Sequence, residues 1–367
     1  MKTFHLESYL ADGVENIVSG ILKATLCNPR ESCFMAKYAS QSKRSSKLRQ
    51  EAQKNGQHIP PFLIASITTQ CNLHCKGCYA RANHSCYDRV PTENARQLLR
   101  AERWGSIFQQ AADLGIGFIL LAGGEPFVRR DVLTTAGEHP SILFPVFTNG
   151  TMFDMDYLEL LDQKRNLIPI VSIEGNRETT DARRGAGVYQ RLRSALQELH
   201  NRGLLFGASV TVTKENLVEV LSDSFINDLN VNGCKAIIYV EYVPVDHQTA
   251  DLALDDETRK WMVKRLDDTR ADHPDMLMVS FPGDEKSSGG CLAAGRGFFH
   301  INAFGGAEPC PFSPYSDINV SDTSLQEALQ SSRFQKLQKG YLMREHTGGC
   351  VLFEQETQVK MLLREST

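Results

Sequence analysis

The sequence predicts an α/β fold built on a parallel sheet, and two observations support this prediction. Between residues 62 and 243, short apolar segments of strand length recur along the chain. Longer segments with helical periodicity separate them, as the crossover connections of parallel strands require. Such alternation is typical of βαβ units. The predicted strands span residues 62–69, 116–121, 142–148, 168–173, 206–213 and 235–243.

Amphipathic segments between these strands predict the helices. In residues 93–114, Ile107 and Ala111 share one apolar helical face. Gly115 follows directly and gives a stop signal. The other predicted helices span residues 154–164, 188–202, 217–229, 255–271 and, nearer the C-terminus, about 324–339.

Residues 1 to about 60 predict a helical extension that ends at the boundary signal Pro60-Pro61. Its second half is rich in Lys, Arg, Gln and Ser, and we interpret this basic face as the solvated side of a helix. The alternative is that this basic face binds an acidic peptide or another anionic substrate. Cys27 and Cys33 also lie here and are interpreted as ordinary thiols. The basic positions are Lys43, Arg44, Lys47, Arg49 and Lys54.

Composition is that of an ordinary globular protein. The 367 residues, 41% hydrophobic and 23% charged, suffice for one large α/β domain with additions or for two domains. A formal net charge of −4 gives no argument for a nucleic-acid partner, and no apolar run reaches the length of a membrane span. The N-terminus lacks a basic segment followed by an apolar one, so we expect no signal peptide and a cytoplasmic protein. Ten cysteines then favour metal or redox chemistry over disulfides.

Polar or acidic residues mark the C-terminal end of every predicted strand. In barrels of parallel strands, functional groups gather at this end. A structural barrel without a ligand would not need such residues, so they indicate a binding site. The strand ends carry, in order, the cysteine loop 71–78, Gly123-Gly124-Glu125-Pro126, Thr148-Asn149-Gly150, Ser172-Ile173-Glu174-Gly175, Thr211 with Thr213 and Asn216, and Glu241-Tyr242.

Three cysteines, Cys71, Cys75 and Cys78, stand directly after the first predicted strand. Their C-x3-C-x2-C spacing allows one loop to bind three irons of a cubane [4Fe–4S] cluster and to leave the fourth iron without a protein ligand. A structural zinc site is the alternative, but it normally needs four N or S ligands in paired C-x2-C units. Only one such pair is present, and His74 lies inside the loop, where it can hardly share the same metal. The spacing therefore favours the cluster.

The cysteine loop and Gly123-Gly124-Glu125-Pro126, about 45 residues further on, together resemble the radical SAM superfamily. The resemblance implies a partial (β/α)6 TIM-type barrel in which S-adenosylmethionine (SAM) chelates the open iron of the [4Fe–4S] cluster. One electron then breaks a carbon–sulfur bond of SAM and yields a 5′-deoxyadenosyl radical. Glycines allow a backbone to approach a ligand closely. The resemblance assigns this role to Gly123, Gly124 and Glu125 beside the SAM ammonium group.

The resemblance implies further SAM contacts at positions that match the family. Tyr79 matches the aromatic position whose side chain or main chain lies against the adenine, with packing against the cysteine loop as the alternative. Ser172 and Arg184 match positions that hold the ribose or the SAM carboxylate, which suits the planar fork of Arg. Glu174 stands where many members have Asp. Thr148 and Asn149 are two further candidates for SAM contacts. The alternative is that they cap a strand-to-helix turn.

The last third of the chain is rich in Gly, Pro and aromatic residues, and Gly295 to Phe312 predicts a hairpin with its turn at Gly305-Gly306. Cys291 and Cys310 flank the hairpin in a C-x13-G-x4-C arrangement, which resembles the first half of the SPASM domain. The resemblance implies that these two, with Cys350, bind an auxiliary [4Fe–4S] cluster. Three unrelated thiols are the alternative.

The chain lacks the C-x2-C-x5-C-x3-C block of a full SPASM domain. We therefore infer one auxiliary cluster, as in the shortened twitch variant. Its fourth iron is either open to substrate or bound by a side chain other than cysteine. Cys86 breaks the spacing of the first loop and is left out of the ligand set, and Cys234 is interpreted as a core thiol.

These observations predict a helical extension (residues 1–60), a radical SAM partial barrel (61–273) and a SPASM/twitch-like domain (274–367). The resemblance implies an oxidoreductase that receives an electron from a flavodoxin- or ferredoxin-type reductant in a low-oxygen setting. The radical then removes a hydrogen atom from the substrate. Glu241 is a candidate catalytic acid or base, with a salt bridge as the alternative.

The SPASM-like pattern favours a ribosomally made peptide as the substrate. Residues 1–60 lack the strand pattern of the winged-helix module that many peptide-modifying relatives carry there, so a small molecule or tetrapyrrole is the second candidate. A protein of another class, a non-catalytic iron–sulfur electron carrier or redox sensor, would explain the cysteines. It would not explain the glycine motif or the polar strand ends.

Overall fold

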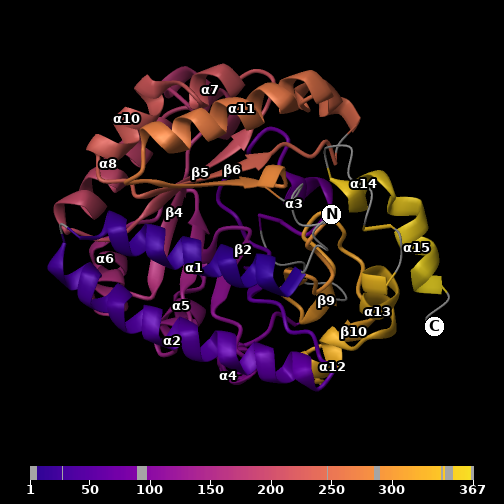
Figure 1. Ribbon diagram of the computed structural model, residues 1–367. Coiled ribbons are helices and arrows are strands. Elements are labelled where there is room, and N and C mark those ends of the chain that lie inside the picture. Colours follow the sequence, from indigo (N-terminus) through magenta and orange to yellow (C-terminus); the bar gives the residue numbers. More distant parts are fainter. Residues whose placement is uncertain are drawn as a thin grey trace.

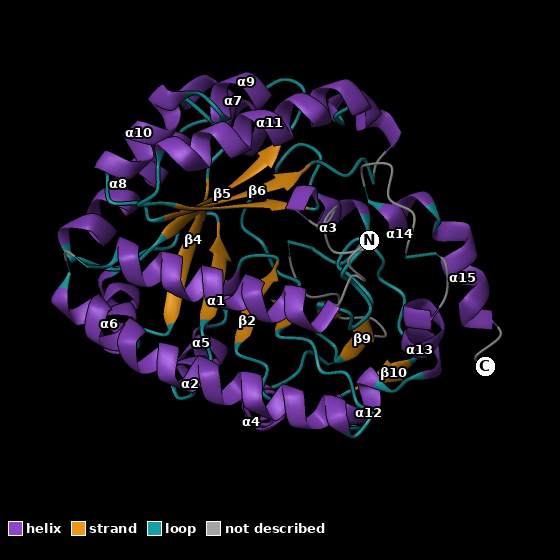
Figure 2. Ribbon diagram, in the orientation of Figure 1, coloured by secondary structure: helices purple, strands orange, loops and turns teal. Residues whose placement is uncertain are grey.

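The computed structural model describes residues 6–26, 28–88, 97–245, 247–284, 290–339, 342–343 and 350–364. These residues form one ten-stranded sheet with helices around it (Figures 1 and 2). The strands are β1 (Phe62–Thr68), β2 (Phe118–Gly123), β3 (Phe144–Thr148), β4 (Leu167–Ser172), β5 (Gly207–Val212), β6 (Ala236–Glu241), β7 (Leu277–Phe281), β8 (Phe298–Ile301), β9 (Gly306–Glu308) and β10 (Ile318–Asn319). The α-helices are α1 (Leu6–Ala24), α2 (Pro29–Lys54), α3 (Tyr79–Ala82), α4 (Ala101–Leu114), α5 (Arg130–Gly137), α6 (Met155–Gln163), α7 (Arg177–Arg184), α8 (Val188–Asn201), α9 (Leu217–Val220), α10 (Asp223–Val231), α11 (Asp256–Asp272), α12 (Leu325–Leu329), α13 (Ser332–Lys339), α14 (Val351–Glu354) and α15 (Glu356–Arg364).

The sheet has the order β10-β9-β8-β1-β2-β3-β4-β5-β6-β7. In this order, all neighbouring strands in the run β8-β1-β2-β3-β4-β5-β6-β7 pair in parallel. On the other side of β8, strands β9 and β10 continue the sheet with antiparallel pairing. The sheet is not closed, so the predicted α/β partial barrel is confirmed. The predicted strands correspond to β1–β6. The sequence did not predict that β7 and β8 pair in parallel with β6 and β1 and widen the barrel on both sides.

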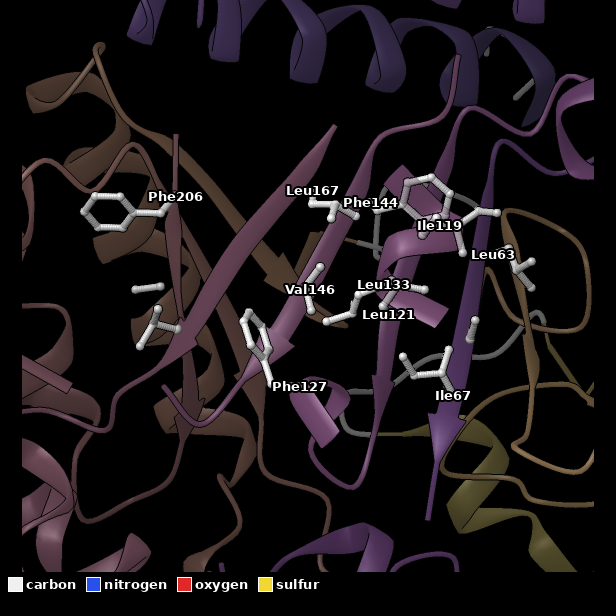
Figure 3. Close-up of a cluster of buried hydrophobic side chains, with 14 of the residues drawn as sticks. Leu63, Ile67, Ile119, Leu121, Phe127, Leu133, Phe144, Val146, Leu167 and Phe206 are labelled. Atoms are coloured by element: carbon white, nitrogen blue, oxygen red, sulfur yellow. The ribbon is translucent and has the colours of Figure 1, made fainter. Parts of the chain in front are cut away.

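The two faces of the sheet differ in exposure. Side chains that face the surrounding helices are fully buried, and Figure 3 shows several of them, such as Leu63, Leu121 and Val146. The opposite, inner face carries the half-exposed side chains that alternate with buried ones along β1, β3, β6 and β7, whereas in β4 and β5 only Ser172 and Thr211 are half-exposed. In small closed barrels, side chains fill the interior. Here part of the inner face keeps contact with solvent, while Phe62, Leu120 and Phe147 pack against the apolar cluster that includes residues of α1.

Helices α1 and α2 cover the end of the barrel at which the strands begin. Val14 and Val18 of α1 belong to one apolar cluster with Phe118, the first residue of β2. Ile168, near the start of β4, is in the same cluster. The helical extension predicted for residues 1–60 therefore packs against the N-terminal strand ends, opposite the ends that carry the predicted site residues.

The predicted basic face of the extension lies on α2. Lys43, Lys47 and Lys54 are exposed, which agrees with the prediction of a solvated face. For Arg49 that prediction is wrong: the side chain is buried, and its guanidinium donates a hydrogen bond to the carbonyl oxygen of Gly115. This bond satisfies a carbonyl at the end of α4, where the helix has no backbone donor of its own left.

Helix boundaries differ from the prediction at two places. The helix predicted for 93–114 begins at Ala101, because residues 97–100 are not helical, and 93–96 lie outside the described residues. The segment 217–229 is divided into α9 and α10. Ser222 causes this break, because its side chain accepts a hydrogen bond from a backbone amide and so begins a new helix. The helix predicted near the C-terminus is likewise divided into α12 and α13.

The predicted C-terminal hairpin is present as β8 and β9, and Gly305 in its turn has a φ of 87°. Because β8 also pairs with β1, the hairpin continues the barrel sheet. The division of the chain at residues 60 and 273 stays a prediction. Within the part of the chain that the structure describes, no helix is both long and apolar enough to cross a membrane.

Candidate iron–sulfur and SAM site

The cysteine loop follows β1, and hydrogen bonds fix its backbone. A later segment folds back beside it, so that Tyr87 N donates to Thr69 O (2.7 Å) and Cys71 N donates to Tyr87 O (3.2 Å). The guanidinium of Arg81 donates to Leu73 O (2.7 Å) inside the loop. Metal ligands must be held close to their productive positions, and these bonds provide such support.

The three thiols of the loop, Cys71, Cys75 and Cys78, are half-buried and none is in a disulfide. Cys86, which the sequence analysis left out, is buried beside them. Its thiol donates a hydrogen bond to the sulfur of Cys71, which lowers the pKa of Cys71 to about 6. Residue spacing gave no sign of this neighbour, because the chain must fold back along β1 to place it there.

The donor set of the loop fits a cubane cluster better than a zinc ion. In a cubane, each thiolate binds a different iron. A structural zinc ion needs four ligands around one point. Across the described ranges, no three His, Cys, Asp or Glu side chains gather as ligands of a single ion. Three half-buried thiols on one loop can each bind a different iron, as the cubane requires.

Two arginines at the end of α7 face the cysteine loop. The amide of Lys76 donates to Arg183 O (2.8 Å), and both arginine side chains pair with the carboxylate of Glu174. Burial raises the pKa of Cys75, and the positive charges of Arg184 and Arg183 oppose this effect. Positive surroundings favour thiolates, which are the form that binds metal. Arg184 is one of the predicted site residues, whereas no motif in the sequence marks its neighbour Arg183.

Glu174 is fully buried, and hydrogen bonds occupy both of its oxygens. Arg184 Nε donates to Oε1 (2.8 Å), and Thr211 N donates to Oε2 (3.0 Å). Burial alone would raise the pKa of Glu174, but Arg183 and Arg184 lower it below its usual value. The Arg184 fork thus pairs with a carboxylate of the chain itself, whereas the resemblance implied a contact with SAM.

The turn Gly123-Gly124-Glu125-Pro126 needs its glycines because another backbone passes close to it. Gly123 has a φ of 122°, and a Cβ at Gly124 would lie 2.0 Å from Gln70 O. The amide of Glu125 donates to the same carbonyl (2.7 Å). The glycines therefore do allow a close approach of the backbone, as expected. The group that they approach is the main chain at the start of the cysteine loop, whereas the resemblance implied SAM.

Glu125 connects this turn to the end of β3. It is 1% exposed and accepts hydrogen bonds from Thr148 Oγ1 (2.7 Å), Asn149 N (2.7 Å) and Phe127 N (3.1 Å). Burial raises the pKa of Glu125 to about 7 although these bonds oppose the shift. Asn149 Nδ2 also donates to Asn72 Oδ1 (2.7 Å) in the cysteine loop, a partner that the sequence analysis missed. Thr148 Oγ1 also accepts a hydrogen bond from Gly150 N (3.1 Å), and Asn149 Oδ1 accepts one from Thr151 N (3.0 Å), which is the turn capping given as their alternative; a contact with SAM stays a prediction.

Two further candidates for SAM contacts are Tyr79 and Ser172. The ring of Tyr79 packs on Phe312, with 4.8 Å between ring centroids, so its side chain faces the C-terminal hairpin. This is the packing alternative, and it leaves the main chain of Tyr79 as a candidate contact for the adenine. Ser172 ends β4 on the inner face, and its hydroxyl lies 3.2 Å from that of Ser209.

Glu241 ends β6 in an ion pair. It is 6% exposed, and Arg259 Nε of α11 donates to its Oε1 (2.6 Å). A neighbouring cation favours the ionised form of a carboxyl group and makes it a weaker base. The geometry is therefore that of the salt bridge, the alternative given for this residue.

The C-terminal cysteines lie in one apolar cluster. Cys291 and Cys310 are buried there, and Cys350, at the start of α14, is half-buried against it. The amide of Cys291 donates to Met343 O (2.9 Å), which ties the hairpin to the segment after α13. Leu337 is in the same cluster. The structure thus places the three predicted auxiliary ligands in or against one apolar cluster, and their role as ligands stays a prediction. Cys234 is fully buried at the start of β6, as predicted for a core thiol.

Three comparisons with known proteins agree. Residues 65–222 match the family model of the Radical SAM superfamily. The chain is 31% identical over 166 residues to the Fe-coproporphyrin III synthase of Methanosarcina barkeri, a match that covers 44% of this chain and only 39% of that protein. It is 26% identical over 319 residues to the AdoMet-dependent heme synthase of the same organism, covering 79% and 88% of the two chains.

Among solved structures, Streptococcus suis SuiB bound to S-adenosylmethionine is similar with a TM-score of 0.66 and 15% identity, over 84% of this chain and 77% of SuiB. SuiB bound to the precursor peptide SuiA gives 0.64 and 16% identity, over 89% and 77%. At such identities the likeness shows a shared fold.

Proposed function

Residues 65–222 match the Radical SAM superfamily, and on this premise we propose that the chain is a member of it and uses a SAM-derived radical to modify a peptide. One observation supports the proposal: three thiols on one loop stand at the C-terminal edge of a barrel whose inner face is half-exposed along β1 and β6. A substrate that lies along this face reaches the loop. A protein that only carries electrons needs no such face.

We assign Cys71, Cys75 and Cys78 as the ligands of a [4Fe–4S] cluster. When bound together with SAM, this group supplies one-electron cleavage of the sulfonium and a 5′-deoxyadenosyl radical. The chain contributes position and charge: Asn149 holds the loop through Asn72, and the nearby arginines offset negative charge on the thiolates.

For SAM we propose contacts at the strand ends. The candidates are the main chain of Tyr79 and the hydroxyl of Ser172, which faces inward from β4. Gly123 and Gly124 are half-buried beside the start of the loop, and we propose their main-chain atoms as further contacts for SAM. The buried residues act indirectly, since their polar atoms are engaged within the protein. These positioning residues are Glu125, Thr148, Asn149, Glu174 and Arg184.

We assign Cys291, Cys310 and Cys350 as ligands of one auxiliary [4Fe–4S] cluster. Their apolar surroundings limit contact with water, and exposure to water is one of the factors that set the potential of a cluster. The reaction class we propose is that of an oxidoreductase, because a hydrogen atom is removed from the substrate. A flavodoxin- or ferredoxin-type reductant and a cytoplasmic, low-oxygen setting complete the proposal.

A tetrapyrrole substrate is the second candidate, and a specific observation favours it. The similarity to an AdoMet-dependent heme synthase extends over 79% of this chain. A peptide substrate is supported by the similar fold of SuiB, a protein whose structure was solved with its precursor peptide SuiA. Both substrates would need the half-exposed inner face of the sheet.

The experiment is anaerobic reconstitution with iron and sulfide, followed by incubation with dithionite and SAM. We expect 5′-deoxyadenosine, detected by mass spectrometry, and about eight irons per chain. If no 5′-deoxyadenosine forms under any reducing condition, the enzyme proposal is wrong and an electron carrier or redox sensor takes its place. A count near four irons would remove only the auxiliary cluster.

The substrate class is tested with Fe-coproporphyrin III as a probe in the same assay. We expect the porphyrin to be recovered unchanged and the yield of 5′-deoxyadenosine to stay the same. Any SAM-dependent conversion of the porphyrin would replace the peptide by a tetrapyrrole.

A further inference from the structure

Three hydrogen-bonded side chains lie in a row where β1 meets the C-terminal hairpin. The hydroxyl of Ser66 on β1 is 2.8 Å from Nε2 of His300 on β8. Nδ1 of the same ring is 2.7 Å from Oε2 of Glu308 on β9. Asn302 Nδ2 donates to the second oxygen of Glu308 (2.5 Å) and holds the carboxylate in place. None of these residues belongs to the cysteine or glycine motifs.

The solvent exposure of the side chains decreases from Ser66 to His300 and Glu308. Ser66 is half-exposed on the inner face, because its neighbours Ala65 and Ile67 point to the surrounding helices and are fully buried. His300 and Glu308 are each 4% exposed. A ligand on the inner face can therefore reach the Ser66 hydroxyl, and it meets the imidazole only through that hydroxyl.

The partners determine which ring nitrogen accepts. A carboxylate can only accept hydrogen bonds, so a neutral His300 carries its hydrogen on Nδ1 and directs it to Glu308. Nε2 then has a lone pair, and Ser66 donates its hydroxyl hydrogen to it. A hydroxyl, a base and a third group that orients the base form the arrangement by which proteins activate hydroxyl groups.

We propose that Ser66 is a base-activated hydroxyl that removes a proton from the substrate; this inference rests on the proposed function and adds a proton-transfer step to it. A hydrogen leaves an N–H or O–H group of the substrate as a proton and binds Ser66 Oγ, while the Ser66 hydrogen passes to Nε2 of His300. The step leaves a substrate anion, a neutral Ser66 and an imidazolium paired with Glu308. No electron moves and no bond to carbon changes. Ser66 is the catalytic residue, and His300 and Glu308 act through it.

The test measures the activation of Ser66 directly, with the reconstituted full chain and a fluorophosphonate probe. A hydroxyl with a bound base reacts with this electrophile faster than an unassisted one. Ser172 and Ser209 are internal controls, because they also lie on the inner face but hydrogen-bond to each other. We expect the probe to label Ser66 about 10²-fold faster than either control, measured by peptide mass spectrometry.

Two variants identify the source of the activation. His300→Gln removes the base, and Glu308→Gln removes the charge that orients it, so both should lower the labelling rate of Ser66 toward that of Ser172. Equal labelling of the three serines in the unaltered protein overturns the proposal without any variant. A rate at Ser66 that His300→Gln does not change overturns it as well. The labelling needs no SAM cleavage, so its failure is distinct from a failure to form 5′-deoxyadenosine.

Discussion

The two cysteine regions of the molecule are built in opposite ways. The loop with Cys71, Cys75 and Cys78 is half-buried and is held by side-chain hydrogen bonds and by two arginines paired with one buried carboxylate. Cys291 and Cys310, in contrast, are buried in an apolar cluster formed by the hairpin and the C-terminal helices.

This difference follows from what each region must admit. A site open to a charged ligand cannot be enclosed by apolar side chains, so its rigidity depends on hydrogen bonds and ion pairs. A site closed to solvent can rely on apolar burial, which stabilises in proportion to the area removed from water. Polar substitutions should therefore damage the first region, and apolar truncations the second.

The largest effect is expected from the joint replacement of Cys71, Cys75 and Cys78 by Ala. Formation of 5′-deoxyadenosine should fall to background, and iron should fall from about eight to about four per chain, because the other cysteines keep their surroundings. Cys33→Ser is the control, since this thiol is exposed on α2, and it should change neither value. Residual SAM cleavage in the triple variant would place the reactive cluster elsewhere.

Glu174→Gln should strongly destabilise the first region. It leaves Arg183 and Arg184, only 16% and 9% exposed, without their countercharge. Loss of one partner from a buried ion pair costs about 3–5 kcal/mol, which urea unfolding would measure. Glu138→Gln is the matched control, because Glu138 is 62% exposed, so its pair with Lys164 should contribute less than about 1 kcal/mol. Equal losses in the two variants would contradict a special role of the buried pair.

Leu337→Ala tests the second region. This side chain is fully buried in the cluster that contains Cys291 and Cys310, and its truncation should cost about 2–5 kcal/mol. We expect a loss of up to about four irons per chain, with SAM cleavage retained. Leu26→Ala, at a position that is 68% exposed, is the control for a leucine outside the core. If Leu337→Ala abolished SAM cleavage first, the two regions would not be independent.

The sequence predicted those parts of this picture that depend on local patterns. Strand and helix periods placed β1–β6, and residue spacing placed the cysteine loop at the end of β1. The missing parts depend on chain segments that meet only in the fold. Ser66 and His300 are 234 positions apart, and their contact exists because β8 pairs with β1. Cys86 reaches Cys71 because the chain folds back after α3.

The contributions of Glu125 and Glu174 to the stability of the fold change with pH in opposite directions. Burial raises the pKa of Glu125 from 4.5 to about 7, so the folded protein binds this proton more tightly than the unfolded chain. Its stabilising contribution is fully present below pH 4.5 and is lost as the pH rises through 7, about 3 kcal/mol in all. For Glu174, whose pKa is lowered, the contribution is present at neutral pH and is lost in acid, as the pH falls from 4.5 through the folded pKa.

The Glu125→Gln variant isolates this effect. Between pH 5 and 8, the free energy of unfolding of the unaltered protein should fall by up to about 3 kcal/mol relative to that of the variant. Urea unfolding at several pH values gives both curves. The variant also loses an acceptor for Asn149 N, which lowers its stability at every pH and leaves the difference in slope unchanged. Parallel curves would show that Glu125 does not titrate in this range.

The smallest effect is expected from Glu241→Gln. The change removes the charge that Arg259 binds, but Arg259 also pairs with Asp256 (3.3 Å), so the cation keeps a partner. We expect a loss of about 1–2 kcal/mol in urea unfolding and SAM cleavage within about twofold of the unaltered protein. Asp256→Asn, which removes the more exposed partner of Arg259, is the control and should cost less. A tenfold loss of 5′-deoxyadenosine at unchanged stability would instead make Glu241 a catalytic residue, because an ion pair that only supports the fold cannot slow the chemistry without weakening the structure.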